Sequence, residues 1–234
     1  MSRVTFTQQD QIGIIKMDDG KANAIQGAFL NDFEGAVEAA EDPQIKAVVI
    51  TGRKGLFSAG LDVRTLPTLE EPERVRVGVR FGQLAARLFK LPKPMVSAID
   101  GHAIAGGMVL AMCADRRVGA DNVKYGMTEV PVGLAMPTVV VEMMRLLLPA
   151  DVLQEAVLEG RTYTADEALR AGLLNSVHPI DDVFDAAMAD AQRLAKLDTE
   201  AYATTKRRMR PALPEHTLEP DFIELARAMP RMAK

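Results

Sequence analysis

Short apolar runs that alternate with longer helical patterns constrain the fold of this chain more than any other feature. Residues 47–51 form a continuous apolar run, which is typical of a strand buried on both faces. A glycine turn and a helical pattern over 71–90 follow it, and a strand at 95–99 then leads to a second glycine turn over 101–107. Strands that alternate with helices indicate an α/β fold.

Periodicity places the other elements. Two β-rich runs, 4–7 and 12–17, have polar residues between them and predict an opening hairpin. A further strand is expected at 117–120. Apolar residues at helical spacing predict further helices at 29–40, 107–114, 139–148, 151–159, 165–171, 181–197, 199–209 and 219–229. We therefore expect one domain over 1–234, with an α/β core over about 1–175 and a helical extension over about 176–234.

The composition is that of a soluble globular protein. A chain of 234 residues, 48% of them apolar, can bury a core without a disulfide or metal staple, and its one cysteine, Cys113, fits a reducing compartment. The net charge of −4 gives no strong attraction to nucleic acid or to an anionic membrane. The start lacks the apolar core of a signal peptide, and the longest apolar stretch, 130–141, is interrupted by prolines. We expect a cytoplasmic protein that does not enter a membrane.

Two turns, 58–62 and 101–107, carry the glycines that suggest chemistry. The first amides of a helix have no partner within that helix and lie at the positive end of its dipole, so a turn that opens a helix can hold an oxyanion or a phosphate. Glycine lets a ligand approach the backbone closely. A single glycine turn is usually structural, but two of them that follow buried strands favour a pair of converging amides, which is an oxyanion hole.

Other catalytic motifs do not fit the spacing. Neither turn has the glycine spacing of a dinucleotide site, and no phosphate-binding loop for a nucleoside triphosphate is present. Ser58 is one residue out of register with a nucleophile elbow. The three histidines, His102, His178 and His216, form no ligand pair at helical spacing, so no metal site is expected. His102 lies near a turn, where a structural role is favoured over catalysis.

Four segments together resemble the crotonase superfamily of enoyl-CoA hydratases and isomerases. The resemblance runs from about residue 4 to residue 210, and its most specific pieces are 57–62, 98–107, 111–115 and 164–174. It implies a spiral of ββα units with a helical C-terminal region, assembly as a homotrimer or a dimer of trimers, and an acyl-coenzyme A thioester as substrate. No separate cofactor is implied, because coenzyme A is part of the substrate.

The resemblance also implies where the substrate lies. The amides of Leu61 and Gly106 would form the oxyanion hole for the thioester carbonyl, and two fixed amides stabilise an enolate without reorganising. Residues on both sides of the first turn, and an earlier loop, would border coenzyme A: Lys21, Ala22, Ala24, Ala59, Gly60, Asp62 and Val63. Apolar residues near the turns are candidates for the acyl pocket, although such residues are more often core: Leu66, Met108, Val109, Val132, Leu134 and Met136.

The acidic residues suggest which reaction the chain performs. Hydratases of this family use two glutamates, and the positions that match them here are Val109 and Glu129. Valine can neither orient a water molecule nor carry a proton, whereas one carboxylate is enough to move a proton between two carbons. The pattern therefore looks more like a Δ3,Δ2-enoyl-CoA isomerase, with Glu129 as the acid and base. Hydration, thioester hydrolysis and decarboxylation remain alternatives within the family.

Other charged residues have simpler interpretations. Glu142 is a rival carboxylate, but Arg145 three residues on favours a surface ion pair, and Asp62 fits a charge that complements the first turn of a helix. The basic group over 206–210 raises the alternative of a non-catalytic RNA-binding or acyl-CoA-binding protein. Such a group is usually a solvated helix face, no aromatic residues interleave with it to stack bases, and coenzyme A phosphates suit it better, so no nucleic acid is expected.

Overall fold

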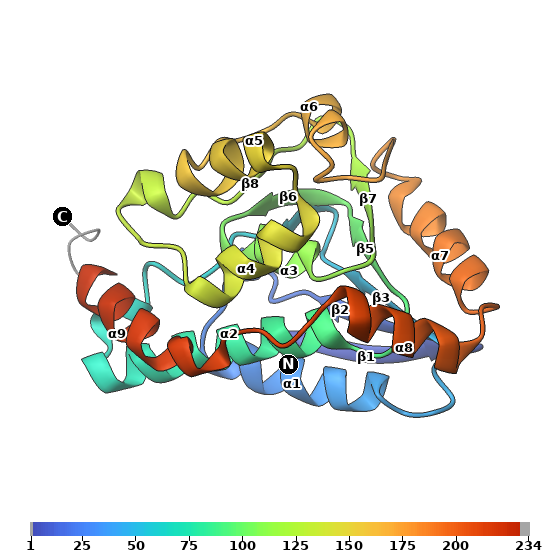
Figure 1. Ribbon diagram of the computed structural model, residues 1–234, viewed down its shortest axis with the longest axis horizontal. Helices are drawn as coiled ribbons and strands as arrows, with labels where there is room; N and C mark the ends of the chain where they lie inside the picture. Colours follow the sequence, from blue (N-terminus) through green and yellow to red (C-terminus); the bar gives the residue numbers. More distant parts are fainter. Residues whose placement is uncertain (1, 230–234) are drawn as a thin grey trace.

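The computed structural model describes residues 2–229, which build two sheets surrounded by helices (Figure 1). The larger sheet has the strand order β1-β2-β3-β5-β7-β9. Its strands are β1 (Val4–Gln9), β2 (Ile12–Met17), β3 (Ala47–Thr51), β5 (Met95–Ile99), β7 (Arg116–Ala120) and β9 (Ser176–His178). Strands β1 and β2 form the expected antiparallel hairpin, and the later pairs are parallel. Strands β3 and β5 are buried along their whole length, as the apolar run of β3 predicts.

A smaller parallel sheet has the order β4-β6-β8. It consists of β4 (Gly55–Ser58), β6 (Gly101–Ile104) and β8 (Tyr125–Gly126). The predicted turn over 101–107 is wrong in part, because residues 101–104 form β6 and the turn begins only where that strand ends. Strands β4 and β8 were not predicted. The ninth strand, β9, was also missed.

The two sheets and the helices repeat one unit along the chain. In each unit a strand of the larger sheet is followed by a strand of the smaller sheet and then by a helix. The three units run β3-β4-α2, β5-β6-α3 and β7-β8-α4, where α2 is Glu71–Lys90, α3 is Gly106–Met112 and α4 is Thr138–Leu147. This repetition confirms the predicted spiral of ββα units followed by C-terminal helices.

The remaining helices cover this core. They are α1 (Gly27–Ala40), α5 (Ala150–Leu153), α6 (Ala165–Arg170), α7 (Val183–Leu194), α8 (Thr199–Met209) and α9 (Leu218–Ala228), with one-turn segments at Leu66–Thr68, Val130–Val132 and Glu215–Thr217. Helix α7 packs on β3, β5 and β7, and α9 lies alongside α2 (Figure 1). The predicted helix at 151–159 divides into α5 and a π-helical turn over Gln154–Leu158.

Helix α9 is fixed to the core at two places. Its Phe222 packs directly on Gly78 of α2, where a Cβ would lie 2.1 Å from the Phe222 ring. Asp221 accepts a hydrogen bond at 2.7 Å from the amide of Thr138, which begins α4. The C-terminal helix therefore folds back onto its own chain, close to the segment that precedes α4. Among residues 2–229, no helix is long and apolar enough to cross a bilayer.

Candidate active site

The three principal candidate residues follow the carboxyl ends of the three strands of the small sheet. Leu61 lies three residues after β4, Gly106 two residues after β6, and Glu129 three residues after β8. Because the strands are parallel and adjacent, their carboxyl ends meet at one edge. Ligands of α/β proteins bind in the space outside such an edge. Residues that are 68 positions apart in sequence are thus brought to one place by the repeat of the fold.

In the first turn, a hydrogen bond to the Gly60 carbonyl, which shares a peptide group with the Leu61 N–H, fixes the direction of that N–H. The carbonyl oxygen of Gly60 accepts a hydrogen bond of 2.8 Å from the amide of Ile25. Because this peptide bond is trans, the Leu61 N–H points away from Ile25. No acceptor for that N–H is found among residues 2–229. Gly60 has φ of +82°, a left-handed conformation that glycine adopts without strain.

In the second turn, Ala105 has φ of +51° and ψ of −131°, a rare conformation for a residue with a side chain. Its amide donates to the carbonyl of Gly126 at 2.8 Å, and its carbonyl accepts from the amides of Met108 and Val109 in α3. The Gly106 N–H therefore points away from its own helix, and within the described part of the chain it too has no acceptor.

The two turns touch each other. A Cβ on Gly60 would lie 2.7 Å from the Gly106 nitrogen, and a Cβ on Gly106 would lie 3.4 Å from the Gly60 Cα. The unbonded Leu61 and Gly106 amides consequently belong to two backbone segments in van der Waals contact. Two free donors this close, each with its direction set by a bonded carbonyl, can bind one oxyanion.

Glu129 is the third member of the group, and its carboxyl is buried with one oxygen that lacks a hydrogen-bond partner. Its exposed fraction is 8%, and its Oε2 has no hydrogen-bond partner in residues 2–229. Burial raises the pKa of Glu129 to about 7, because the charged carboxylate loses its hydration. Its backbone carbonyl accepts from the amides of Val132 and Leu134, which fixes the loop that carries it.

Helix α3 brings no second acid to this place. All of its residues, Gly106–Met112, are buried, and none can ionise. Val109, which the sequence matches to the first glutamate of hydratases, is 1% exposed. In the described residues, no group of three His, Cys, Asp or Glu side chains could hold a metal ion.

The loop expected to border coenzyme A lies against the first turn. The amide of Ala59 donates to the carbonyl of Ala22 at 3.1 Å, so the two segments run together. Three of the predicted residues, Lys21, Ala59 and Val63, are exposed, whereas Ala22, Ala24 and Asp62 are half-buried and Gly60 is buried. Asp62 accepts from the amides of Arg64 and Thr65 and so shapes a turn rather than the first turn of an α-helix.

The sequence did not reveal the structural role of two polar residues that build this loop. Asn23 is wholly buried, with φ of +46°, and its side chain bonds to the backbone on both sides. Ser58 is wholly buried as well, and its hydroxyl accepts from the amide of Gly60 at 3.1 Å. The available signal was a polar side chain next to each predicted turn, which a single sequence does not distinguish from ordinary loop polarity.

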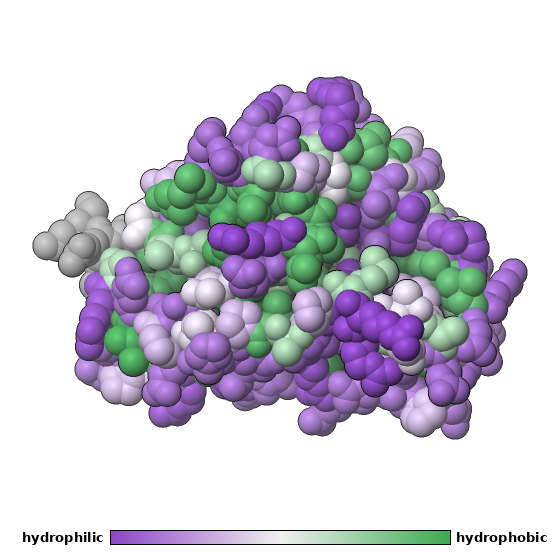
Figure 2. Space-filling view, viewed as in Figure 1, coloured by the Kyte–Doolittle hydropathy of each residue, from purple (hydrophilic) through white to green (hydrophobic). Residues whose placement is uncertain are grey.

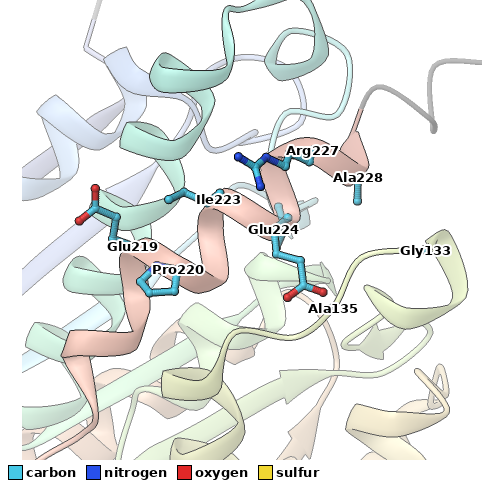
Figure 3. Close-up of a pocket in the computed structure, with 9 residues that line it drawn as sticks. Gly133, Ala135, Glu219, Pro220, Ile223, Glu224, Arg227 and Ala228 are labelled. Carbon is cyan, nitrogen blue, oxygen red and sulfur yellow. The ribbon is translucent and has the colours of Figure 1, made fainter.

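The residues suggested for the acyl pocket divide into two groups. Leu66, Met108, Val109 and Leu134 are buried and Met136 is half-buried, whereas the Val132 side chain is 47% exposed at the surface. None of these six residues lines the groove of about 840 Å³ that opens between Gly133, Ala135 and α9. Figure 3 shows the Glu224 carboxylate extending from α9 toward Ala135, with Pro220 and Ile223 on the same helix.

The rival candidates have structural partners. Glu142 forms the expected surface ion pair with Arg145, at 3.4 Å. The His102 Nδ1 accepts from the amide of Lys124 at 3.0 Å, which gives this residue a structural role. The basic group of α8 is not a solvated face throughout: Lys206 is 5% exposed and Arg210 is 9% exposed, and both pair with Asp115.

Comparison with known sequences defines the class of protein. The sequence profile of the enoyl-CoA hydratase/isomerase family matches residues 7–227. A probable enoyl-CoA hydratase of Mycobacterium avium is 37% identical over 172 residues, which are 73% of this chain and 66% of that relative. The carnitinyl-CoA dehydratase of Escherichia coli is 33% identical over 203 residues, which are 86% of this chain and 77% of that relative.

Solved structures agree. An enoyl-CoA isomerase of Mycobacterium tuberculosis superimposes with a TM-score of 0.85 at 33% identity, over 99% of this chain and 98% of that one. The human mitochondrial Δ3,Δ2-enoyl-CoA isomerase gives a TM-score of 0.89 over 97% of this chain and 92% of that one, and at 23% identity it shows the shared fold alone. This chain belongs to the enoyl-CoA hydratase/isomerase family, within the crotonase superfamily.

Proposed function

We propose that this protein is an acyl-CoA-processing enzyme that moves a double bond, a Δ3,Δ2-enoyl-CoA isomerase with Glu129 as its one acid and base. The observation that carries the proposal is the buried Glu129 carboxyl, which has an unbonded oxygen and lies at the strand edge that also presents the free amides of Leu61 and Gly106. Burial of a carboxylate oxygen without a hydrogen-bond partner costs free energy, and carboxyls perturbed in this way are concentrated at functional sites.

The proposed reaction is a proton transfer in two steps. The Glu129 carboxylate takes a proton from C2 of a 3-enoyl thioester, and the electron pair moves onto the thioester carbonyl oxygen. The amides of Leu61 and Gly106 stabilise that enolate oxygen. The carboxylic acid then returns the proton to C4 as the double bond forms between C2 and C3. Nothing is oxidised or reduced, so the proposal names no cofactor beyond the coenzyme A of the substrate.

The protonation behaviour of Glu129 suits both steps. With its pKa raised to about 7, the side chain is partly ionised near neutral pH and can both accept and return a proton. A carboxyl with the ordinary pKa of about 4.3 would be a weaker base toward carbon. Desolvation is therefore the physical source of the proposed activity.

The choice of isomerisation over hydration rests on Val109. Adding water across a conjugated double bond requires a group to hold that water opposite Glu129, and α3 offers only apolar side chains. The names of relatives do not decide the matter. The same Mycobacterium tuberculosis protein is described as an enoyl-CoA isomerase in one structure and as a probable hydratase in another, and hydratase names are frequent among the relatives.

An assay of three product types tests the proposal. The protein is incubated with 3-hexenoyl-CoA and with crotonyl-CoA, and isomerisation, hydration and release of free coenzyme A are measured. We expect isomerisation with little hydration. Glu129→Gln should lower the isomerisation rate by about 10²–10⁴-fold, whereas Glu142→Gln, which alters a surface ion pair, should leave it unchanged.

Several results would redirect the assignment. Isomerase activity of Glu129→Gln within about threefold of the parent would remove Glu129 from the mechanism. Rapid hydration of crotonyl-CoA would make the protein a hydratase and refute the argument from Val109. Release of free coenzyme A or of carbon dioxide from other thioesters would favour a hydrolase or a decarboxylase. Binding of thioesters without turnover would leave a non-catalytic acyl-CoA binder.

We also propose how the rest of the substrate lies. The loop 21–24 and the exposed Ala59 and Val63 would border coenzyme A, and the acyl chain would extend from Glu129 between Leu66, Met108 and Leu134 toward the groove under α9. RNA binding has less support than acyl-CoA binding, because Lys206 and Arg210 are engaged with Asp115. Titration with salt separates the two, since RNA binding weakens steeply as salt rises.

Self-association as a trimer or a dimer of trimers belongs to the same proposal. Figure 2 shows hydrophobic residues gathered over α4 and its surroundings on one face. Among the exposed large apolar side chains are Leu146, Leu158 and Met209, which are 45%, 67% and 70% exposed. Exposed apolar area of this kind favours contact with another protein surface. Measurement of the molar mass in solution tests the assembly, and a monomer at micromolar concentration would contradict it.

A further inference from the structure

Ser58, the last residue of β4, touches both turns of the candidate site. Its hydroxyl accepts a hydrogen bond from the amide of Gly60 at 3.1 Å and donates one to the carbonyl of Asn23 at 2.8 Å. Its own carbonyl oxygen lies against the second turn, where a Cβ on Gly107 would be only 2.2 Å away. The side chain has no exposed surface, so it is enclosed between these segments.

The acceptor of the Ser58 hydroxyl is itself held firmly. The side-chain amide of Asn23 donates to the carbonyls of Met17 and Phe57, each at 3.0 Å, and its oxygen accepts from the amide of Asp19 at 2.9 Å. The Asn23 backbone amide donates to the Asp19 carboxylate. Asn23 is thus bonded to β2 and β4 at once, and its carbonyl is a fixed point for Ser58.

These bonds determine where the Leu61 amide points. Gly60 is bonded on both sides: its amide donates to the Ser58 hydroxyl, and its carbonyl accepts from Ile25. Removal of the Ser58 hydroxyl would leave the Gly60 amide without its acceptor, and glycine has wide conformational freedom. The peptide group between Gly60 and Leu61 would then be held by the Ile25 hydrogen bond alone, so the direction of the Leu61 N–H would be less tightly fixed. A donor displaced by about 1 Å from its ligand can lower a rate about 10²-fold.

We propose that Ser58, held by Asn23, is a positioning residue for the oxyanion hole. Its hydroxyl sets the direction of the Leu61 N–H relative to that of Gly106, without touching the substrate. The inference rests on the proposed function, because it requires a thioester oxygen between those two amides. It differs from a merely structural role, in which Ser58 would add stability to the turn without affecting how strongly the carbonyl is polarised.

A chromophoric thioester separates these two roles. In 4-(dimethylamino)cinnamoyl-CoA, electrons are drawn from the amino group toward the carbonyl, so the absorption moves to longer wavelength when the carbonyl oxygen accepts strong hydrogen bonds. The full chain and its Ser58→Ala variant are titrated with this probe. Ser97→Ala is the matched control. Ser97 lies in β5 of the larger sheet and is equally buried, and its hydroxyl donates to the carbonyl of Ala111 in α3 at 3.1 Å.

We expect a shift to longer wavelength with the parent and with Ser97→Ala. Ser58→Ala should lose at least half of that shift while its Kd for the probe stays within about threefold of the parent. With 3-hexenoyl-CoA its kcat should fall by about 10- to 100-fold at a KM within about threefold, because the lost interaction acts on the enolate more than on the bound substrate. A full shift in folded Ser58→Ala overturns the inference and leaves the proposed function intact.

Failure of the proposed function would look different. If the parent binds the probe without any shift, no oxyanion hole acts on the carbonyl, and both proposals fall. If Ser58→Ala does not fold, Ser58→Cys replaces it, since a thiol has similar size and is a weak hydrogen-bonding group. A folded Ser58→Cys protein with the full shift and the parent kcat would equally overturn the positioning role.

Discussion

Among the places where this molecule buries ionisable groups, the one around Glu129 and the one around Lys206 and Arg210 differ in what surrounds the charge. Glu129 is 8% exposed and has an oxygen without any partner in residues 2–229. Asp115, at the other place, is bonded by Lys206 at 2.7 Å and by Arg210 at 2.9 Å. The second cluster satisfies its charges within the fold, and the first does not.

The cations of the Asp115 cluster have further partners: Lys206 donates to the carbonyl of Lys93, and Arg210 donates at the ends of two helices. Arg210 donates to the carbonyl of Phe89 near the end of α2 and to that of Cys113 just after α3. Helix ends of this kind carry partial negative charge and unbonded carbonyls. Burial lowers the pKa of Lys206 to about 8 even though Asp115 opposes that shift. The cluster therefore docks α8 onto the core, and this structural role accounts for its buried charges.

The hydrogen-bond partners of a buried charge, rather than its pKa, distinguish a functional group from a structural one in this molecule. Both Glu129 and Lys206 have pKa values displaced by desolvation, so the displacement alone does not distinguish them. The distinguishing observation is the unbonded oxygen of Glu129, together with the two free amides at the same strand edge. Substitutions at the two places should consequently have opposite effects on stability and on catalysis.

The largest effect on stability is expected at Asp115. Asp115→Asn leaves Lys206 and Arg210 buried without a counter-ion, and removal of one partner of a buried ion pair destabilises by about 3–5 kcal/mol. Urea unfolding measures this. In the folded fraction, kcat on 3-hexenoyl-CoA should equal that of the parent. A loss below about 1 kcal/mol would show that the helix ends alone hold these cations.

Glu129→Gln should change stability in the opposite direction. The folded-state pKa of about 7 lies above the ordinary glutamate pKa of about 4.3, so the parent's folded state holds its proton more tightly than the unfolded state does. As pH rises from about 4.5 to 7, the parent loses about 2–3 kcal/mol of stability that the glutamine variant does not lose. Unfolding of both proteins at pH 5 and pH 8 measures the difference, and an unchanged difference between the two pH values would contradict the desolvated carboxyl.

The pH dependence of activity gives a third comparison. The base form of Glu129 predominates only above its pKa of about 7, so kcat/KM for isomerisation should fall tenfold per unit as pH decreases below that value. Asp115→Asn should keep the same profile, because Asp115 belongs to the other cluster. A profile that stays flat down to pH 5 would mean that the reacting base is not Glu129.

The general arrangement of the site could be predicted from the sequence, whereas its details could not. Strand-and-turn spacing predicted two glycine turns after buried strands, and the resemblance matched Leu61 and Gly106 to an oxyanion hole and Glu129 to a catalytic acid. The strands that bring these residues together could not be predicted, because β4, β6 and β8 have only four, four and two residues. Runs so short carry no alternating pattern, and glycines within them read as turns.

The burial of Lys206 and Arg210 was hidden for another reason. On a helix, a dense group of cations is usually solvated, and nothing within 199–209 indicates otherwise. The groups that compensate these charges are backbone carbonyls and one carboxylate from 89–115, about a hundred residues away in sequence. Contacts of that range depend on how α8 docks, which no local pattern encodes. The same holds for Asn23 and Ser58, whose partners lie 34 and 35 residues away.

The smallest predicted effect concerns the groove beside α9. If the acyl chain reaches this groove, Ala135→Leu should obstruct long chains more than short ones, because Ala135 lines the groove. We expect kcat/KM for 3-dodecenoyl-CoA to fall by about three- to tenfold while that for 3-hexenoyl-CoA changes by less than about twofold. Ala203→Leu, in a different cavity beside α8, is the control. Equal losses for both substrates would mean that the substitution disturbs the nearby Glu129 loop. No loss for either substrate would mean that the acyl chain lies outside this groove.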